Sequence, residues 1–391
     1  MAAARASSRT IARVTAGFGL ENLPYGVVAP RGGTPRCAVR LGDDAFDLAA
    51  LARAGRLGEL PDGVFEAPVL NPFLALGRRA WEDVRKRLQQ LLPAPGAAIP
   101  LADADVLLPV AIGDYVDFYS SLEHATNLGR MFRPGVEPLL PNWRHLPVGY
   151  HGRASSIVVS GTPVRRPCGQ RPPAAEGGAP TFGPSERLDV ELELGFFTGG
   201  PENPLGTPLP IAAAPQRVFG FVLVNDWSAR DIQRWEYQPL GPFLGKSFAT
   251  SVSGWVVPLE ALEPFLVPAP PQEPQPLPYL RTAGDWALDA RLEVELNGEA
   301  ISSVNARGLY WTFPQQLAHA AVNGTNVRAG DLYASGTISG STPGSEGSLI
   351  ERYRGARFLA DGDAVVLRGR CGGEGRAEVA LGEVRGTIVG A

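Results

Sequence analysis

Residues 188–197 read LDVELELGFF, in which apolar side chains alternate with Asp189, Glu191 and Glu193. Successive side chains of a β-strand point to opposite faces of the sheet, so residues two apart share a face. The leucines and the valine would lie on one face and the carboxylates on the other. The stretch therefore predicts a strand that places Glu191 and Glu193 side by side, about 7 Å apart.

Strand patterns dominate the chain from about residue 110 onward. The other predicted strands are at residues 157–159, 218–224, 292–296 and 364–367. Helical spacing is limited to three short segments, at residues 121–132, 229–237 and 314–322. The chain has 47 glycines and 37 prolines among 391 residues, which favours strands and turns over a helical bundle. These features predict a mainly β fold with a few short helices.

Three proline-rich stretches separate these elements. Residues 172–184 are expected to form a long surface loop, and residues 264–278 an extended polyproline-type crossing. Residues 91–109 are rich in proline and alanine and are predicted to be a linker. The linker divides the chain into a smaller N-terminal part and a larger C-terminal part.

The N-terminal part has the pattern of a small module. Strands are predicted at residues 25–28 and 37–41, and a helix at residues 73–92. The first 19 residues contain no acidic residue and are expected to be a disordered tail. The predicted organisation is a tail at 1–19, an N-terminal domain with its linker at 20–109, and a catalytic domain at 110–391.

Composition excludes several classes of protein. The net charge of −4 arises from 36 basic and 40 acidic residues and gives no reason to expect a nucleic acid or an anionic membrane as partner. No apolar run approaches the roughly 18 residues of a membrane span. The three cysteines are far apart and form no Cys-x-x-Cys pair, so no disulfide framework or zinc site is indicated. With no secretory signal, we expect a cytoplasmic protein.

His124 is the first candidate catalytic residue. Ser120 and Glu123 have the Ser-x-x-Glu spacing of a capping box, which predicts a helix beginning at about Ser121. The positive end of the helix dipole would then favour the neutral imidazole that a general base requires. Asp117 precedes the cap and would face the same space. The alternative is a structural helix start with a surface histidine.

Further candidates come from two other segments. In residues 224–250, Asp226 follows a strand, and Arg230, Gln233 and Tyr237 would share one face of the next helix. Such donors suit a carboxylate or a developing oxyanion, although a solvated polar face is the ordinary alternative. Lys246 is one of only two lysines, and it lies between two small residues. The Gly- and Ser-rich residues 333–351 predict a flexible loop over a ligand, or a plain hairpin.

These segments together resemble the fumarylacetoacetase (fumarylacetoacetate hydrolase) family. The resemblance is carried by DYVDFYSSLEHATNLGRMFR (114–133), LLPNWRHLPVGYHGRASSIVVSGTP (139–163), DVELELGFF (189–197), NDWSARDIQRWEY (225–237), PLGPFLGKSF (239–248) and ASGTISGS (334–341). It covers nearly the whole chain from Glu21 onward. It implies a small N-terminal SH3-like barrel followed by a larger mixed β-sandwich roll, and a homodimer.

The resemblance also implies roles for particular residues. The metal ligands would be Asp117, Glu191, Glu193 and Asp226, with Lys246 and Thr250 beside a secondary cation position. His124, oriented by Glu351, would activate water, and the oxyanion would be surrounded by Arg230, Gln233 and Lys246. The substrate pocket would be lined by Tyr119, Arg133, Tyr150, Gln233, Tyr237 and Thr337. One departure is Ala249, where the family usually has glycine, at the secondary cation position.

The implied reaction is metal-dependent hydrolysis of a carbon–carbon bond in a small diketo acid. The substrate would be 4-fumarylacetoacetate, and the products fumarate and acetoacetate, as in the last step of tyrosine and phenylalanine breakdown. Four carboxylates in one pocket need a cation, and an all-oxygen set suits Mg²⁺ or Ca²⁺. The alternatives are a related acylpyruvate hydrolase or β-keto acid decarboxylase with the same metal set, or a module that binds without turnover.

Overall fold

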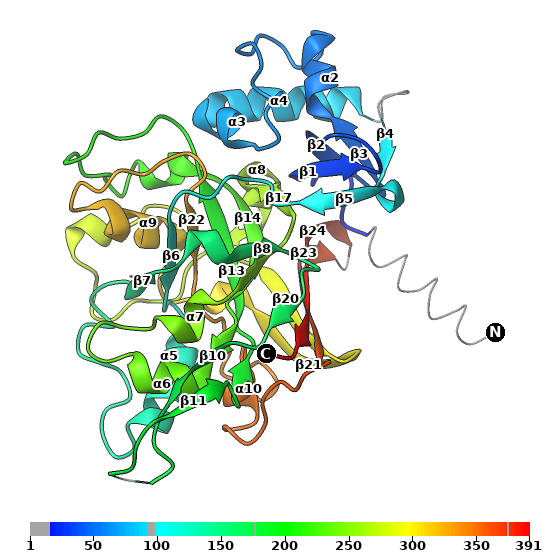
Figure 1. Cartoon of the computed structure of the whole chain (residues 1–391). Coiled ribbons are helices and arrows are strands. Elements are labelled where there is room, and N and C mark those ends of the chain that lie inside the picture. The colour runs from blue at the N-terminus through cyan, green and yellow to red at the C-terminus, as the bar shows by residue number, and fades with distance from the viewer. Residues whose placement is uncertain (1–15, 93–97, 176, 374) are drawn as a thin grey trace.

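The computed structural model describes residues 16–92, 98–175, 177–373 and 375–391, and these form a mainly β fold (Figure 1). Most of the expected tail, residues 1–15, lies outside the described residues. The prediction of a disordered tail is wrong for residues 16–19, which pack on the C-terminal sheet. The Gly17 carbonyl accepts hydrogen bonds from the Asn22 side chain at 2.6 Å and from the Ala380 amide at 2.9 Å.

A 13-stranded sheet runs through the molecule, and β13 and β14 lie near its middle. Its main path is β4-β3-β2-β1-β17-β14-β13-β22-β6-β7, and β5, β8 and β16 pair beside this path. The strands from the C-terminal part are β6 (Tyr115–Phe118), β7 (Gly149–His151), β8 (Ile157–Val159), β13 (Leu192–Thr198), β14 (Val218–Asn225), β16 (Thr250–Val252), β17 (Trp255–Pro258) and β22 (Leu332–Ala334).

The predicted strand at 188–197 is present but is divided into two. β12 (Leu188–Asp189) pairs with β15 (Ser228–Ala229), and β13 resumes at Leu192 after two residues outside any strand. The predicted alternation of faces is confirmed, because the apolar residues at 188, 190, 192 and 194 all join the main core. The opposite face is not solvated, since Asp189, Glu191 and Glu193 are also buried.

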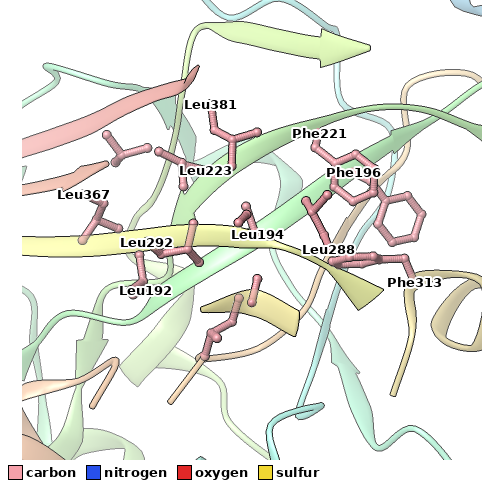
Figure 2. Packing of buried hydrophobic residues seen from close by; sticks show 14 of the residues in the cluster. Leu192, Leu194, Phe196, Phe221, Leu223, Leu288, Leu292, Phe313, Leu367 and Leu381 are labelled. Atoms are coloured by element: carbon pink, nitrogen blue, oxygen red, sulfur yellow. The ribbon is translucent and has the colours of Figure 1, made fainter. Parts of the chain in front are cut away.

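A second, five-stranded sheet covers this core. Its order is β21-β20-β23-β24-β9, formed by β21 (Glu299–Asn305), β20 (Ala290–Leu296), β23 (Ala364–Gly373), β24 (Arg376–Val389) and β9 (Val164–Arg165). Figure 2 shows the core between the sheets, where Leu194 and Leu223 of the large sheet meet Leu292 and Leu381 of the second. The layers bury the apolar face of β13 and leave its carboxylate face for the site.

The N-terminal module extends the large sheet. β1 (Tyr25–Pro30) pairs with β17, so the sheet is continuous between the two parts of the chain. The module's other strands are β2 (Arg36–Leu41), β3 (Asp44–Asp47), β4 (Ala98–Pro100) and β5 (Ala104–Leu107), and its helices are α2 (Leu48–Arg53), α3 (Asn71–Ala75) and α4 (Arg78–Leu91). In Figure 1 these helices lie at one end of the molecule. The SH3-like barrel stays a prediction of the resemblance.

Two predictions about this module are wrong. The expected linker contains β4 and β5, because its apolar side chains Ile99 and Val106 pack against a small core that includes Trp255. Residues 93–97 of that linker lie outside the described residues. The predicted helix at 73–92 is two helices, since Gly77 adopts φ 85°, a left-handed conformation that ends a helix.

The three helices predicted in the C-terminal part are confirmed as α5 (Leu122–Phe132), α6 (Arg230–Glu236) and α9 (Phe313–Ala321). Three four-residue helices were not predicted: α7 (Leu244–Ser247), α8 (Leu259–Leu262) and α10 (Leu349–Arg352). Helices of one turn are too short for an apolar repeat to reveal. In Figure 1, α5, α6 and α10 gather at the end of the molecule away from α4.

The two remaining proline-rich stretches are only partly irregular. The end of the expected loop at 172–184 is a strand, β11 (Thr181–Pro184), which pairs with β10 (Cys168–Arg171). The expected crossing at 264–278 contains β18 (Leu266–Val267), paired with β19 (Ala287–Leu288). Across the described ranges, none of the helices has the length and apolar character needed to cross a bilayer.

Candidate active site

Four carboxylates from different strands and connections of the large sheet converge at one place. Asp117 is on β6, Glu191 lies between β12 and β13, Glu193 is on β13, and Asp226 follows β14. The register pairs Leu192 with the last residue of β14, which sets Glu191 beside Asp226. One oxygen from each of the four lies within 4.8 Å of the others, and all four residues are buried. The sheet thus brings together the four acids that the family resemblance named as metal ligands.

Several carboxylate oxygens of this cluster receive no hydrogen bond from the described residues. Both oxygens of Glu193 and the Oδ1 atom of Asp117 are buried and accept no hydrogen bond from the described residues. Burial, and then the neighbouring carboxylates, raise the pKa of Glu193 and of Asp117 well above their usual values. Unpartnered carboxylate oxygens that converge on one point fit a cation, since a bare cluster of this kind is costly to bury.

Lys246 supplies the positive charge inside the cluster. It is buried on α7, and its ammonium contacts Glu191 and lies 2.6 Å from Asp226 Oδ2. Burial alone would raise the pKa of Glu191, but Lys246 and Arg230 outweigh it and lower that pKa to about 2. Glu191 is therefore an ionised member of the cluster at neutral pH.

Asp226 is held by two hydroxyl groups as well as by Lys246. The Thr250 hydroxyl on β16 donates to Asp226 Oδ1 at 2.8 Å, and the Tyr150 hydroxyl on β7 donates to Oδ2 at 2.7 Å. A small cavity of about 60 Å³ lies here, lined among others by Tyr150, Asp226, Lys246 and Thr250. Lys246 and Thr250, the two residues expected beside a secondary cation, thus both bond to the carboxylate of Asp226.

His124 lies in the first turn of α5 and is buried. Its Nδ1 atom is 2.6 Å from Glu351 Oε2, on α10. The expected capping box is wrong: the helix is capped by Ser121, whose hydroxyl accepts from the His124 amide at 3.3 Å. Ser120 is engaged elsewhere, because its hydroxyl accepts a hydrogen bond from Gln316. The N-cap is thus one residue later than predicted, and His124 lies in the first turn of the helix as expected.

Glu351 is fixed by three further donors. They are the Asn127 side chain at 3.0 Å and the hydroxyls of Ser339 at 2.9 Å and Ser348 at 2.7 Å. Burial would raise the pKa of Glu351, but His124 and these hydrogen bonds outweigh it and lower the pKa to about 2. An ionised Glu351 accepts the hydrogen of Nδ1 and leaves Nε2 of a neutral ring as the basic atom.

Arg230 begins α6 and links the carboxylates to the helix. Its Nη1 atom lies 2.6 Å from Glu191 Oε1 and donates to Gln233 Oε1 at 3.3 Å. Its Nε atom donates to Asp189 at 2.8 Å. The third nitrogen, Nη2, is buried and has no acceptor among the described residues. A buried guanidinium with one unused donor can serve an oxygen atom of a ligand.

The Gly-rich loop after β22 lies against β6. Gly336 adopts φ 75°, and a Cβ there would come within 2.0 Å of the Phe118 carbonyl oxygen, so only glycine fits. The next residue, Thr337, is buried, and its hydroxyl has no hydrogen-bond partner in the described part of the chain. The loop therefore brings an unused hydroxyl close to the strand that carries Asp117.

Three expected pocket residues lie farther out. The Tyr119 ring packs edge-on against His124, with ring centroids 5.3 Å apart. Arg133 caps the end of α5 and donates to the Pro138 carbonyl at 2.5 Å. Tyr237 ends α6 and is 40% exposed, and its hydroxyl accepts from Gln238. The described contacts bring Tyr119 to the site but do not join Arg133 or Tyr237 to the carboxylate cluster.

The other histidines lie outside the carboxylate cluster. His319 Nδ1 is 3.1 Å from the Tyr279 hydroxyl, and His151 lines the small cavity. Sequence reasoning missed Asp189, Asn127, Ser339 and Ser348, which hold Arg230 and Glu351 in place. All four stand in stretches already singled out, but only Asp189 has a spacing that places it on the same strand face as a predicted site residue, Glu191.

Comparisons with known proteins identify the family of the chain. The family described as fumarylacetoacetate (FAA) hydrolase C-terminal matches residues 115–389, and the family described as fumarylacetoacetase N-terminal matches residues 21–115. The chain is 49% identical to the fumarylacetoacetase of Rattus norvegicus, 48% to that of Homo sapiens and 49% to that of Caenorhabditis elegans. Each alignment spans 405 residues and covers 95% of this chain and 96% of the relative.

Solved structures with the same fold are more distant in sequence. A fumarylacetoacetate hydrolase from Exiguobacterium antarcticum is 18% identical, with a TM-score of 0.55 over 94% of this chain and 100% of that one. A maleylpyruvate hydrolase from Sphingobium sp., in complex with manganese (II) ion and pyruvate, is 18% identical, with a TM-score of 0.53 over 94% of this chain and 99% of that one. At this identity the likeness concerns the fold alone.

Proposed function

The chain belongs to the fumarylacetoacetate hydrolase family, and we propose that it hydrolyses the carbon–carbon bond of 4-fumarylacetoacetate to fumarate and acetoacetate. The observation that carries the proposal is the composition of the buried site described above. It combines four converging carboxylates, a histidine paired with a carboxylate, and a guanidinium with an unused donor. These three parts can hold a Lewis-acidic cation, activate water and stabilise an oxyanion, which are the contributions that cleavage of a 1,3-diketone by water can use.

We propose that Asp117, Glu191, Glu193 and Asp226 hold a divalent cation, Mg²⁺ or Ca²⁺. The unpartnered oxygens of Glu193 and Asp117 support this, and hard cations prefer oxygen ligands. When bound, such an ion would act as a Lewis acid that polarises the diketone oxygens and stabilises negative charge on them. Lys246 and Thr250, which both contact Asp226, would lie beside a secondary cation position.

His124 would serve as the general base. Glu351 holds Nδ1, so Nε2 accepts a proton from a water molecule. The water oxygen attacks the carbonyl carbon next to the fumaryl unit and forms a tetrahedral oxyanion. The Nη2 group of Arg230, with the side chains of Gln233 and Lys246, would donate hydrogen bonds to this oxyanion.

Collapse of the oxyanion breaks the carbon–carbon bond. The bonding electron pair leaves with the acetoacetate fragment as its enolate, and the proton held by His124 Nε2 then goes to that carbon. The fumaryl carbonyl becomes a carboxylic acid that keeps the water oxygen and its second hydrogen, and ionisation of this acid to fumarate releases one proton to solvent. We propose that the substrate pocket is lined by Tyr119, Arg133, Tyr150, Gln233, Tyr237 and Thr337.

We also propose that the protein is a cytoplasmic homodimer that acts at the last step of tyrosine and phenylalanine breakdown. The support is its full-length relationship to fumarylacetoacetases. Light scattering during size-exclusion chromatography would give the mass of the assembly, for comparison with 41.5 kDa for one chain. A monomer at working concentration would contradict the homodimer.

The activity itself can be tested by the loss of fumarylacetoacetate absorbance with purified protein. We expect turnover in the presence of Mg²⁺ or Ca²⁺ and none with excess chelator. The same assay with acylpyruvates, and with product analysis for decarboxylation, addresses the related activities that share this metal set. Faster turnover of an acylpyruvate than of fumarylacetoacetate would overturn the proposed substrate.

A further inference from the structure

Asp189 has a set of partners that the proposed chemistry does not use. It is fully buried at the end of β12, and its two oxygens accept four hydrogen bonds. Oδ1 accepts from the amides of Val190 at 2.8 Å and Leu349 at 2.7 Å. Oδ2 accepts from Arg230 Nε at 2.8 Å and from the Ile350 amide at 3.2 Å.

These partners belong to two separate parts of the site. Arg230 carries the donor proposed to meet the oxyanion. Leu349 and Ile350 begin α10, and the next residue is Glu351, which orients His124. The single carboxylate of Asp189 therefore touches both the oxyanion side and the backbone that carries the partner of the base. Glu191, two residues after Asp189, also contacts this guanidinium, with its Oε1 atom 2.6 Å from Arg230 Nη1.

We propose that Asp189 is a positioning residue for the hydrolysis, which fixes Arg230 relative to the His124–Glu351 pair. Arg230 has three nitrogen donors, and Asp189 and Glu191 occupy two of them. With both occupied, the guanidinium plane is fixed, and Nη2 is left without an acceptor among the described residues. Without Asp189, Nε would lose its acceptor and the plane could turn.

The proposal predicts a kinetic effect that is larger than a loss of packing would give. A displacement of about 1 Å in a catalytic group can cost on the order of 10²-fold in rate. Asp189 does not reach the proposed substrate pocket, so kcat should fall while KM changes little. The proposal rests on the proposed function for its rate measurements, but the geometry of Arg230 can be measured separately.

The test uses Asp189→Asn, which keeps the shape of the side chain. An amide oxygen can still accept from the start of α10, but an amide NH₂ then faces Arg230 Nε, and two donors cannot bond. We expect kcat to fall roughly 10- to 100-fold with KM and metal content near normal. In a double-mutant cycle, Asp189→Asn should add little to Arg230→Gln, because both act through the same guanidinium.

Asp231→Asn is the matched control. Asp231 is the next residue along α6 and is also buried, but its oxygens accept from Ser185 at 2.6 Å and from the Glu186 amide at 2.8 Å. We expect this variant to lose melting temperature without losing kcat. Equal kcat losses in the two variants, or full additivity with Arg230→Gln, would overturn the positioning role.

A spectroscopic measurement separates this inference from the proposed function. A buried Nε–H bonded to a carboxylate should give a protected arginine signal in nitrogen-15 NMR, assigned by its absence in Arg230→Gln. We expect Asp189→Asn to shift or lose this signal and Asp231→Asn to keep it. An unchanged signal in Asp189→Asn would refute the inference even in an active enzyme. Absence of fumarylacetoacetate turnover in the wild type would refute only the proposed function.

Discussion

His124 Nδ1 lies 2.6 Å from Glu351 Oε2, although 227 positions separate the two residues in the chain. Both side chains are buried, and Asn127, Ser339 and Ser348 hold the carboxylate from other directions. Glu351 therefore holds the imidazole ring of His124 in one orientation, because Glu351 is itself held in place by these three side chains. In the proposed mechanism, this arrangement leaves the other ring nitrogen, Nε2, for proton transfer.

Replacing His124 by alanine should lower kcat by roughly 10² to 10⁴, the usual contribution of a general base. The fold should survive, because the helix cap at Ser121 uses the backbone amide of residue 124 and not its ring. Steady-state kinetics and a melting curve would check this. His319→Ala removes a half-buried histidine that contacts Tyr279 and should keep normal kcat. Wild-type turnover in His124→Ala would mean that the base lies elsewhere.

Glu351 should contribute stability that depends on pH. Its pKa in the folded protein is about 2, below its ordinary value of about 4.3 in an unfolded chain. The stabilisation is thus fully present above about pH 4.3 and is lost as the pH falls toward 2. The lowered pKa corresponds to on the order of 3 kcal/mol in the free energy of unfolding.

Urea unfolding of wild type and Glu351→Gln between pH 6 and pH 2 measures this effect. We expect a smaller loss of stability over that range in Glu351→Gln, because glutamine does not titrate. Glu299→Gln, at an exposed position on β21, controls for the removal of one negative charge. Parallel pH profiles for wild type and Glu351→Gln would show that the pair contributes no such stability.

Removing the metal should abolish activity and lower the melting temperature. A ligand that binds only the folded state stabilises it by about 2.7 kcal/mol at a hundredfold excess over its dissociation constant. Melting scans and activity assays with and without EDTA would measure both effects. If EDTA changed neither the midpoint nor the rate, the metal assignment would be wrong.

Glu193→Gln sharpens this test, because the Glu193 oxygens have no hydrogen-bond donor among the described residues. Without a cation, an uncharged amide should relieve the repulsion from Asp117 and Asp226. We expect this variant to melt at or above the temperature of the EDTA-treated wild type, and to show no further response to EDTA. An EDTA response equal to that of the wild type would exclude Glu193 as a ligand.

The sequence predicted the strand around Glu193 well, because a period of two is a local property of the chain. The core face of that strand and the three acids opposite it follow from spacing alone. The role of Asp189 could not be predicted in this way, since it depends on amides at 349 and 350, which lie 160 and 161 positions away. Short-range rules also misplaced the cap of α5, because Ser120 and Ser121 both have a cap hydroxyl, and in the structure the Ser120 hydroxyl bonds to Gln316, 196 positions away.

Lys246 offers a test of charge against shape. Its ammonium contacts Glu191 and Asp226 at once, in a buried position. The backbone there has little freedom, because a Cβ at the preceding Gly245 would lie 2.7 Å from the Gln233 amide nitrogen. At this point α7 packs closely against the backbone of α6. The extra length of an arginine side chain would instead displace the substrate beside the cluster.

Lys246→Arg should therefore lower kcat strongly, although it keeps the positive charge. A guanidinium is planar and wider than the compact ammonium of lysine, and misplacement of about 1 Å can cost on the order of 10²-fold. Metal content and melting temperature should stay near normal, because Asp117, Glu193 and the other two acids remain. Steady-state kinetics with metal analysis would check this. The control is Lys86→Arg, the other lysine of the chain, which is exposed on α4 and should be neutral. Full activity in Lys246→Arg would show that the position needs only a positive charge, whatever the shape of the group that carries it.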